Sequence, residues 1–143
     1  MTARPEHIGR VLEQVAAWTR VLGETRARPL GDRRLSRSQT DALFLLARAK
    51  RPLTPGRLAG ALHLTPGAVT QLLEGLRRAE LVTQGPHPDD ARSQLVTLSP
   101  AARQRVSEFE QATITSLADR FAALDDTELA NLAALLARTR TLA

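Results

Sequence analysis

The sequence predicts a mainly α-helical fold with about six helices and one small β-hairpin. Two short helix patterns stand back to back in the middle of the chain, and each is opened by the same Thr-Pro-Gly signal, at residues 54–56 and 65–67. A turn-rich stretch between two β-prone runs follows them, and long helix patterns flank the whole region. This order predicts a winged helix-turn-helix, in which the hairpin is the wing.

Length and composition favour a single domain over residues 1–143. The chain has 143 residues, of which 43% are hydrophobic, and no Pro/Gly/Ser-rich linker divides it. Its formal charge of +5 indicates a polyanionic partner, and the absence of cysteine excludes disulfides. No apolar run approaches the roughly 18 residues of a membrane-spanning helix, and no signal-peptide pattern is present. We therefore expect a cytoplasmic bacterial protein with no membrane partner.

The first predicted helix, residues 6–25, carries an apolar stripe that has no partner nearby in the sequence. The members of the stripe recur at helical spacing and are Ile8, Val11, Leu12, Val15, Trp18 and Leu22. A helix of this kind must pack against another part of the protein or against a second copy. Trp18, the only tryptophan, is assigned to this packing rather than to ligand stacking.

An arginine-rich loop follows the first helix. Residues 1–53 hold eleven cations against five acids, whereas residues 54–95 hold four of each and are formally neutral. Arg33, Arg34 and Arg37 are therefore possible phosphate contacts for a nucleic-acid partner. The alternative is a solvated loop whose arginine content reflects genome composition, and both interpretations stay open.

The predicted winged helix-turn-helix unit spans residues 36–98. Its first helix starts near Ser36 or Ser38 and supports the two short helices that follow. Thr54 and Thr65 are placed to cap those two helices, with proline at the first helical position of each. Each helix has one apolar face, formed by Leu58, Ala59 and Leu62 in the first and by Val69, Leu72, Leu73 and Leu76 in the second.

The outward face of the second short helix is small, polar and uncharged. Gly67, Thr70 and Gln71 lie three to four residues apart and form this face. Such a face can lie against base edges in a major groove, and Ala68 is a further small side chain beside it. Thr65 and the backbone amides at the helix start are the predicted phosphate contacts. The alternative is the ordinary polar face of a soluble amphipathic helix.

A hairpin wing is predicted directly after this helix. Residues 81–83 and 95–98 are short β-prone runs, and a loop rich in glycine, proline and aspartate joins them. Arg92 is predicted to enter a narrow minor groove, and Asp90 to hold its guanidinium in a fixed direction. Ser93 follows in the same segment and is included in the predicted DNA contacts. The alternative is an ordinary solvated ion pair.

The order of these motifs resembles that of the multiple antibiotic resistance regulator (MarR) family of winged-helix transcription factors. The resemblance covers nearly the whole chain. It depends most on the Asp-x-Arg-Ser sequence that begins at Asp90 and on the Val-Thr-Leu-Ser-Pro segment before the next long helix.

Three features depart from the family pattern. Glu80 and Ala102 stand where glycine is usual, and the first of these substitutions is expected to alter the helix exit. Thr83 and Gln84 lack the basic residue that is usual there, which removes an expected phosphate contact. None of the three removes the wing.

Two further helices are predicted over residues 100–143. Ser99 and the proline after it open the first, and Asp125 opens the second with Glu128 in a capping box. These helices have more apolar surface than the winged unit is able to cover. The resemblance implies that residues 6–25 and 100–143 are dimerisation helices of a homodimer. The alternative is that they complete a monomeric helical core.

The sequence gives little support for an enzymatic function. The eight glycines form no G-x-G-x-x-G or P-loop pattern. His7, His63 and His87 are far apart and lack metal-ligand spacing, so neither a metal nor a cofactor is expected. His63 is expected instead at the turn between the two short helices, where histidine tolerates the left-handed conformation.

These observations predict a sequence-specific DNA-binding transcription regulator, which we expect to act as a repressor. Two copies related by a two-fold axis would need a pseudo-palindromic operator with half-sites roughly 10 bp apart. The resemblance implies a small, often aromatic, effector that binds between the dimer helices and the DNA-binding unit and relieves repression. The alternative function is a winged-helix protein-interaction module without specific DNA binding.

Overall fold

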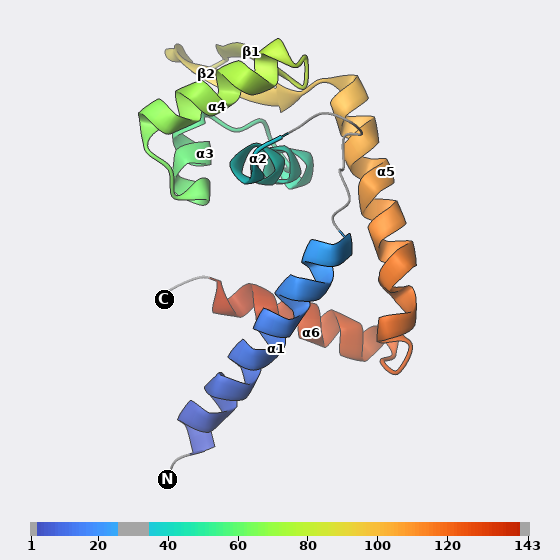
Figure 1. Cartoon of the computed structure of the whole chain (residues 1–143). Helices are drawn as coiled ribbons and strands as arrows, with labels where there is room; N and C mark the ends of the chain where they lie inside the picture. The colour runs from blue at the N-terminus through green and yellow to red at the C-terminus, as the bar shows by residue number, and fades with distance from the viewer. Residues whose placement is uncertain (1–2, 26–34, 141–143) are drawn as a thin grey trace. The chain divides into compact units, whose positions relative to one another are not determined.

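The structure, a computed structural model, describes residues 3–25 and 35–140. These residues form six α-helices, one short 3-10 helix and a two-stranded antiparallel hairpin (Figure 1). The predicted fold class, mainly helical with a small β-hairpin, is therefore confirmed. No helix within the described ranges has the length and apolar character that a membrane crossing requires.

The chain divides into two compact units, Met1–Glu110 and Gln111–Ala143. The first unit contains α1 (Ala3–Thr25), α2 (Arg37–Arg48), α3 (Pro55–Leu62), α4 (Pro66–Arg78), β1 (Val82–His87), β2 (Asp90–Leu98) and the beginning of α5 (Pro100–Leu117). The second unit contains the end of α5, the 3-10 helix η1 (Ala118–Phe121) and α6 (Asp126–Thr139).

Side-chain caps fix the starts of the helices, as the sequence predicted. The Oγ1 atoms of Thr54 and Thr65 each accept a backbone N–H three residues on, both at 3.2 Å. Ser36 is the N-cap of α2 and forms a capping box with Gln39. Asp125 starts α6 in the same way together with Glu128. These caps place the helix boundaries within a residue of the predicted ones.

The two short helices end in residues with left-handed backbone conformation. His63, with φ 54°, follows α3 as predicted, and Glu80, with φ 58°, follows α4. At the second site the N–H of Leu81 reaches back to the carbonyl of Leu76 at 2.9 Å, which closes the helix end. Glu80 thus keeps the exit that glycine would provide, so the expected change of helix exit is not seen. A non-glycine residue in this conformation costs about 1–2 kcal/mol.

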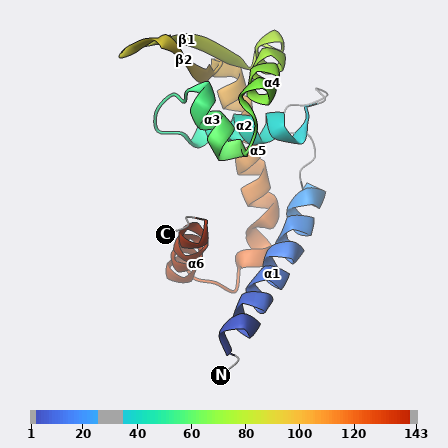
Figure 2. The ribbon, with the colours of Figure 1, turned by 90° about the vertical axis from the view of Figure 1, so that its left-hand side faces the viewer.

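The hairpin is longer than predicted. Strand pairing runs from Val82 opposite Leu98 to Pro86 opposite Gln94 and then, after a register shift that leaves residues 91–93 without partners in the opposite strand, to His87 opposite Asp90. Residues 88–89 form the turn. The prediction of a loop between residues 83 and 95 is therefore wrong. Pro86 pairs opposite Gln94 within the ladder, because both strands of a two-stranded sheet are edges and a missing N–H can face solvent there. In Figure 2 the turn end of the hairpin projects beyond the helices of the winged unit.

A third segment ties the hairpin to the loop before α3. The N–H of Val96 donates to the carbonyl of Leu53 at 2.8 Å and forms an isolated antiparallel bridge. Sequence reasoning did not anticipate this contact, since a single bridge has no period of its own. It fixes the base of β2 beside the start of α3.

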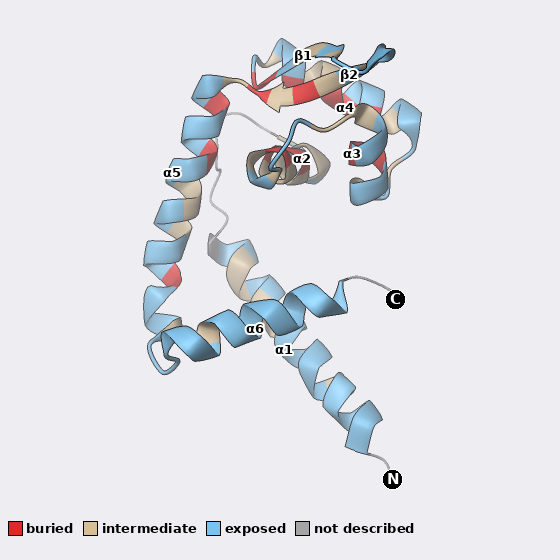
Figure 3. Ribbon diagram, turned by 180° about the vertical axis from the view of Figure 1, so that it is seen from behind, coloured by how far each residue is buried: buried red, intermediate tan, exposed pale blue. Residues whose placement is uncertain are grey.

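One hydrophobic core joins α2, α3, α4, the base of the hairpin and the first turns of α5. Its buried members are Ala42, Leu43, Leu46, Leu58, Ala59, Val69, Leu72, Leu73, Leu76, Leu81, Val82, Val96, Leu98, Ala102 and Val106. Figure 3 shows these buried residues on the inner sides of the elements. The core holds the winged unit together and sets the direction of α4 and the hairpin.

Gly75 on α4 leaves room for the side chain of Gln39 on α2. A Cβ atom at Gly75 would lie 2.8 Å from Nε2 of Gln39. The same glutamine accepts the N–H of Ser36 through Oε1 at 2.9 Å, so its side chain is held in the capping box of α2. The absence of a side chain at Gly75 therefore leaves the Gln39 amide in place to complete the cap of α2.

Candidate nucleic-acid interface

Helix α4 presents the exposed face that the sequence predicted for base contact. Gly67, Thr70 and Gln71 are exposed, whereas Val69 between them is buried. Ala68 is half-buried at the edge of this face. Because the core fixes the inner side of the helix, the outer side is presented in one orientation.

The hydroxyl group of Thr70 forms a hydrogen bond within its own helix. Its Oγ1 donates to the carbonyl of Pro66 at 3.0 Å. The hydroxyl proton is therefore taken, which the sequence did not predict. The oxygen can still accept a hydrogen bond from a base amino group, and the methyl group can contact a thymine methyl.

The hydroxyl group of Thr65 also forms a hydrogen bond within the helix, at the start of α4. Its side chain caps the helix by accepting the N–H of Ala68 at 3.2 Å. The hydroxyl proton remains free to donate to an anion, and the exposed helix start adds a partial positive charge. Thr65 can thus serve as cap and phosphate donor at once.

The polar face continues into the last turns of α4, beyond the residues that the sequence predicted for it. Glu74 lies four residues after Thr70, and its carboxylate is paired with Arg78. Arg77 is exposed and forms no ion pair with any described residue. The helical spacing from Thr70 would have found both Glu74 and Arg77.

The wing places Arg92 on strand β2 rather than in a loop. Asp90 Oδ1 accepts the backbone N–H of Arg92 at 3.0 Å. Within the described part of the chain, no ion pair joins Asp90 to the Arg92 guanidinium. The prediction that the Asp90 carboxylate orients the Arg92 guanidinium is therefore corrected. Asp90 instead fixes the backbone of Arg92, because an aspartate carboxylate can reach the backbone N–H two residues later. The side chain of Arg92 is exposed and Ser93 is half-buried.

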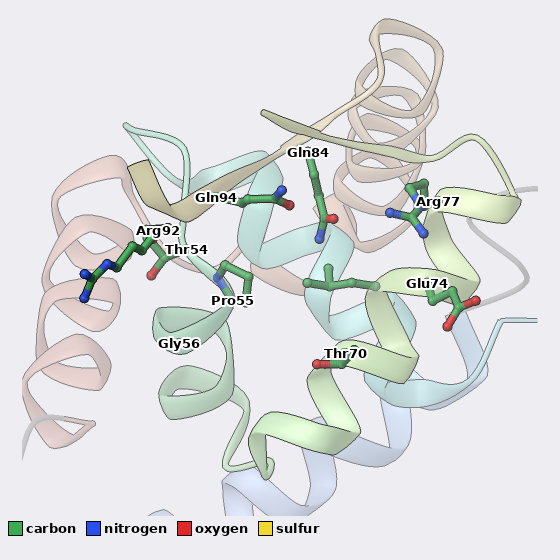
Figure 4. A pocket seen from close by; sticks show the side chains of 11 residues that line it. Thr54, Pro55, Gly56, Thr70, Glu74, Arg77, Gln84, Arg92 and Gln94 are labelled. Atoms are coloured by element: carbon green, nitrogen blue, oxygen red, sulfur yellow. The ribbon is translucent and has the colours of Figure 1, made fainter. Parts of the chain in front are cut away.

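An open groove of about 530 Å³ lies between α3, α4 and the hairpin. It brings together Thr70 from the predicted base-reading face and Arg92 and Ser93 from the predicted wing contact, but not Gly67, Gln71 or Asp90. Its lining consists of Thr54, Pro55, Gly56, Thr70, Leu73, Glu74, Arg77, Gln84, Arg92, Ser93 and Gln94. Figure 4 shows Gln84 and Gln94 extending from the two strands over this groove, with Thr70 on its opposite side.

The arginines predicted before α2 are only partly within the described residues. Arg33 and Arg34 lie outside them. Arg37, at the first position of α2, is highly exposed and has its Nε 3.9 Å from Oδ2 of Asp41. At that distance the pair leaves the guanidinium free for another anion, as a surface ion pair is weak.

The fold and this site define a winged helix-turn-helix protein, and comparisons with known proteins narrow the class. A sequence profile of the MarR family matches residues 35–93. An uncharacterised HTH-type transcriptional regulator of Mycobacterium bovis is 34% identical over 94 residues, which are 66% of this chain and 65% of that protein. The matched part therefore spans slightly less than two thirds of the relative's own length.

Two solved structures share the fold over nearly the whole chain. A mutant MarR from E. coli complexed with operator DNA gives a TM-score of 0.62 at 26% identity and covers 97% of each chain. MepR of S. aureus in a DNA-binding conformation gives a TM-score of 0.71 at 19% identity and covers 90% of this chain and 95% of that chain. The chain is thus similar to MarR-family regulators in the sequence of its winged unit and in its fold.

Proposed function

We propose that this protein is a DNA-binding transcription regulator that represses its target genes as a homodimer. The main supporting observation is that Thr70, from the exposed polar face of α4, and the wing residue Arg92 line the same open groove. A helix in a major groove and a hairpin beside it are the arrangement that this geometry fits. E. coli MarR, a similar protein, has been solved with operator DNA. Such a role places the protein in the cytoplasm and requires no catalytic residue.

In this proposal Thr70 and Gln71 contact base edges, and Gly67 and Ala68 allow α4 to approach them closely. Thr65 and the backbone amides of the first turn hold phosphate. Arg92, with Asp90 fixing its backbone and Ser93 beside it, reaches the adjacent minor groove.

The helices outside the winged unit would join two copies. The exposed large apolar residues that support this are Ile8, Val11, Leu12, Val15, Ile114, Leu124, Leu132, Leu135 and Leu136. They lie within the two segments proposed for dimerisation, 6–25 and 100–143, and a second copy would cover them. The two reading units, 36–98 in each copy, would then meet half-sites roughly 10 bp apart on a pseudo-palindromic operator. A small aromatic effector bound near these helices would relieve repression.

The test compares the operator with random DNA. Footprinting of the region upstream of the gene locates the operator, and the double variant Thr70→Ala, Gln71→Ala is then measured on the operator and on a random duplex. We expect a loss of about 1–3 kcal/mol on the operator and a much smaller loss on random DNA. Equal losses would show that these side chains only position the helix. No protected region at all would favour a protein-interaction module instead.

Arg92→Ala tests the wing separately. We expect operator binding to weaken by about 1–3 kcal/mol and the salt slope to fall by about one per subunit, with the assembly state unchanged. An unchanged salt titration would remove Arg92 from the interface. Arg37→Gln tests the proposed phosphate contact at the start of α2, and we expect the variant to lose affinity for operator and random DNA by similar factors.

A further inference from the structure

We propose that the groove between α4 and the hairpin holds the sugar-phosphate backbone of one DNA strand mainly through uncharged amides, those of Gln84 and Gln94. Arg77 completes this row on the helix side. The inference rests on the proposed DNA-binding function and adds to it a contact set that carries little salt dependence. Three observations support it: the side chains alternate between the two faces of the hairpin, the two glutamine amides have no hydrogen-bond partner among the described residues, and the hairpin has little charge.

The alternation of the strands places both glutamines on the inner face of the hairpin. Val82 and Val96 are buried against the core, and Gln84 and Gln94 each lie two residues from one of them toward the turn. Side chains two apart on a strand share a face. The face that covers the core at the base of the hairpin therefore becomes polar where the hairpin extends past the core and over the groove (Figure 4).

The opposite face of the hairpin differs in chemistry. There the hydroxyls of Thr83 and Thr97 pair across the strands at 2.9 Å, which satisfies both side chains. Neither Gln84 nor Gln94 has a hydrogen-bond partner among the described residues. Two amides with four free N–H donors thus face the groove, whereas the two threonine hydroxyls on the outer face are hydrogen-bonded to each other.

The position of the groove identifies what would pass through it. If α4 lies in a major groove and Arg92 reaches the neighbouring minor groove, one phosphate backbone must run between them, because a backbone separates adjacent grooves of a duplex. In Figure 4 the Arg92 side chain points away from Gln84 and Gln94, which leaves these amides and Arg77 for the strand that passes between. Phosphate oxygens are acceptors, and amide N–H groups are suitable donors for them.

The hairpin has a small negative formal charge, so its contacts with phosphate would depend mainly on uncharged donors. Residues 82–98 contain one arginine against two aspartates, which leaves a formal charge of −1. On the helix side, the carboxylate of Glu74 is neutralised by Arg78, so Arg77 is the cation that borders the amides. A neutral donor contacts phosphate without releasing a counterion, and it therefore adds affinity without steepening the salt dependence.

The experiment measures the affinity of the whole chain for duplexes of random sequence between 50 and 200 mM salt, as order-of-magnitude working limits. The double variant Gln84→Leu, Gln94→Leu should bind about tenfold more weakly at every salt concentration, with an unchanged slope. Gln84→Lys should steepen the slope by about one per subunit, and Arg77→Gln should flatten it by a similar amount. Thr83→Val, on the outer face of the same hairpin, is the matched control and should bind like the parent.

Three outcomes would overturn the inference. The double leucine variant could bind like the parent, or Gln84→Lys could leave the slope unchanged, and either result would place the backbone outside the groove. A loss that varies strongly among duplexes of different base composition would mean that the amides read bases instead. Failure of the parent itself to bind any duplex would contradict the proposed function, and this result is distinct from failure of the variants alone.

Discussion

The winged unit and the terminal helices use the same kind of apolar stripe with different results. Helix α4 buries Val69, Leu72, Leu73 and Leu76 against the core, whereas no residue of α6 is buried. Helix α1 likewise leaves Ile8, Val11, Leu12 and Val15 about half exposed. An amphipathic pattern therefore predicts that a helix forms, but whether its apolar face is covered depends on which other elements of the chain are able to reach it.

This difference suggests a division of roles that can be tested. The winged unit has a closed core and a polar outer surface, which suits a module that holds its reading face in one orientation. The terminal helices retain uncovered leucines, which suit contact with a second copy. Matched substitutions in the two regions should therefore have different effects.

The largest effect is expected from a cavity in the winged core. Leu43 on α2 is 1% exposed, so Leu43→Ala should lower the free energy of unfolding by about 2–5 kcal/mol. Urea denaturation followed by circular dichroism measures this loss. Leu136→Ala on α6, where the parent residue is 44% exposed, is the matched control. Equal losses at low protein concentration would show that α6 is as well covered as the core.

A charge on the exposed stripe of α6 should affect assembly rather than folding. Leu135→Glu places a carboxylate where a second copy would bury it, and we expect the dimer to weaken by about 2–3 kcal/mol, which is about 30- to 150-fold in dissociation constant. Sedimentation velocity measures the change. Ala134→Glu, which lies roughly opposite the centre of the leucine stripe, should leave assembly unchanged. A variant Leu135→Glu that dimerises like the parent would place the interface elsewhere.

Loss of a helix cap should produce different readouts in the two regions. Ser36→Ala removes the cap of α2 and should lower global stability by about 1 kcal/mol, because α2 is part of the core. Asp125→Ala removes a comparable capping box from α6. There the same cost should be seen as faster hydrogen exchange of the α6 amides in monomeric protein, with little change in global unfolding. A global loss in both variants would show that α6 unfolds together with the core.

The smallest effect is expected at the end of α4. Glu80→Gly removes a side chain from a left-handed position but increases the freedom of the unfolded chain, so a net gain of up to about 1 kcal/mol is expected. Thermal denaturation measures it. Lys50→Gly, outside helix and strand and with no positive φ, should give no gain. A loss of stability in Glu80→Gly would mean that the glutamate side chain contributes more than its backbone costs.

Much of the fold could be predicted because its signals are local. Thr54, Thr65 and Asp125 mark helix starts by residue type, and the leucine spacing marks the buried faces. The conformation of Glu80 could not be read from its residue type, since glutamate has no preference for positive φ. The hairpin was underestimated because Gly85 and Pro86 are common in turns, whereas pairing with the opposite strand holds both of them in the ladder.

The candidate site was predicted less completely than the fold. The outer face of α4 followed from helical spacing, but the commitment of the Thr70 hydroxyl to Pro66 depends on a rotamer that spacing does not fix. The hydrogen bond from Arg92 to Asp90 required the backbone geometry of the hairpin. Gln84 and Gln94 were missed as groove residues because their positions follow from strand register, which became known only with the full length of the hairpin.

The central claim is that two copies of this chain place their winged units on one duplex. Sedimentation equilibrium of the protein with the footprinted upstream duplex tests it most directly. We predict a complex of two chains per duplex, with protection of two related half-sites roughly 10 bp apart on one face of the DNA. A saturated complex with one chain per duplex, or protection without paired half-sites, would contradict the account.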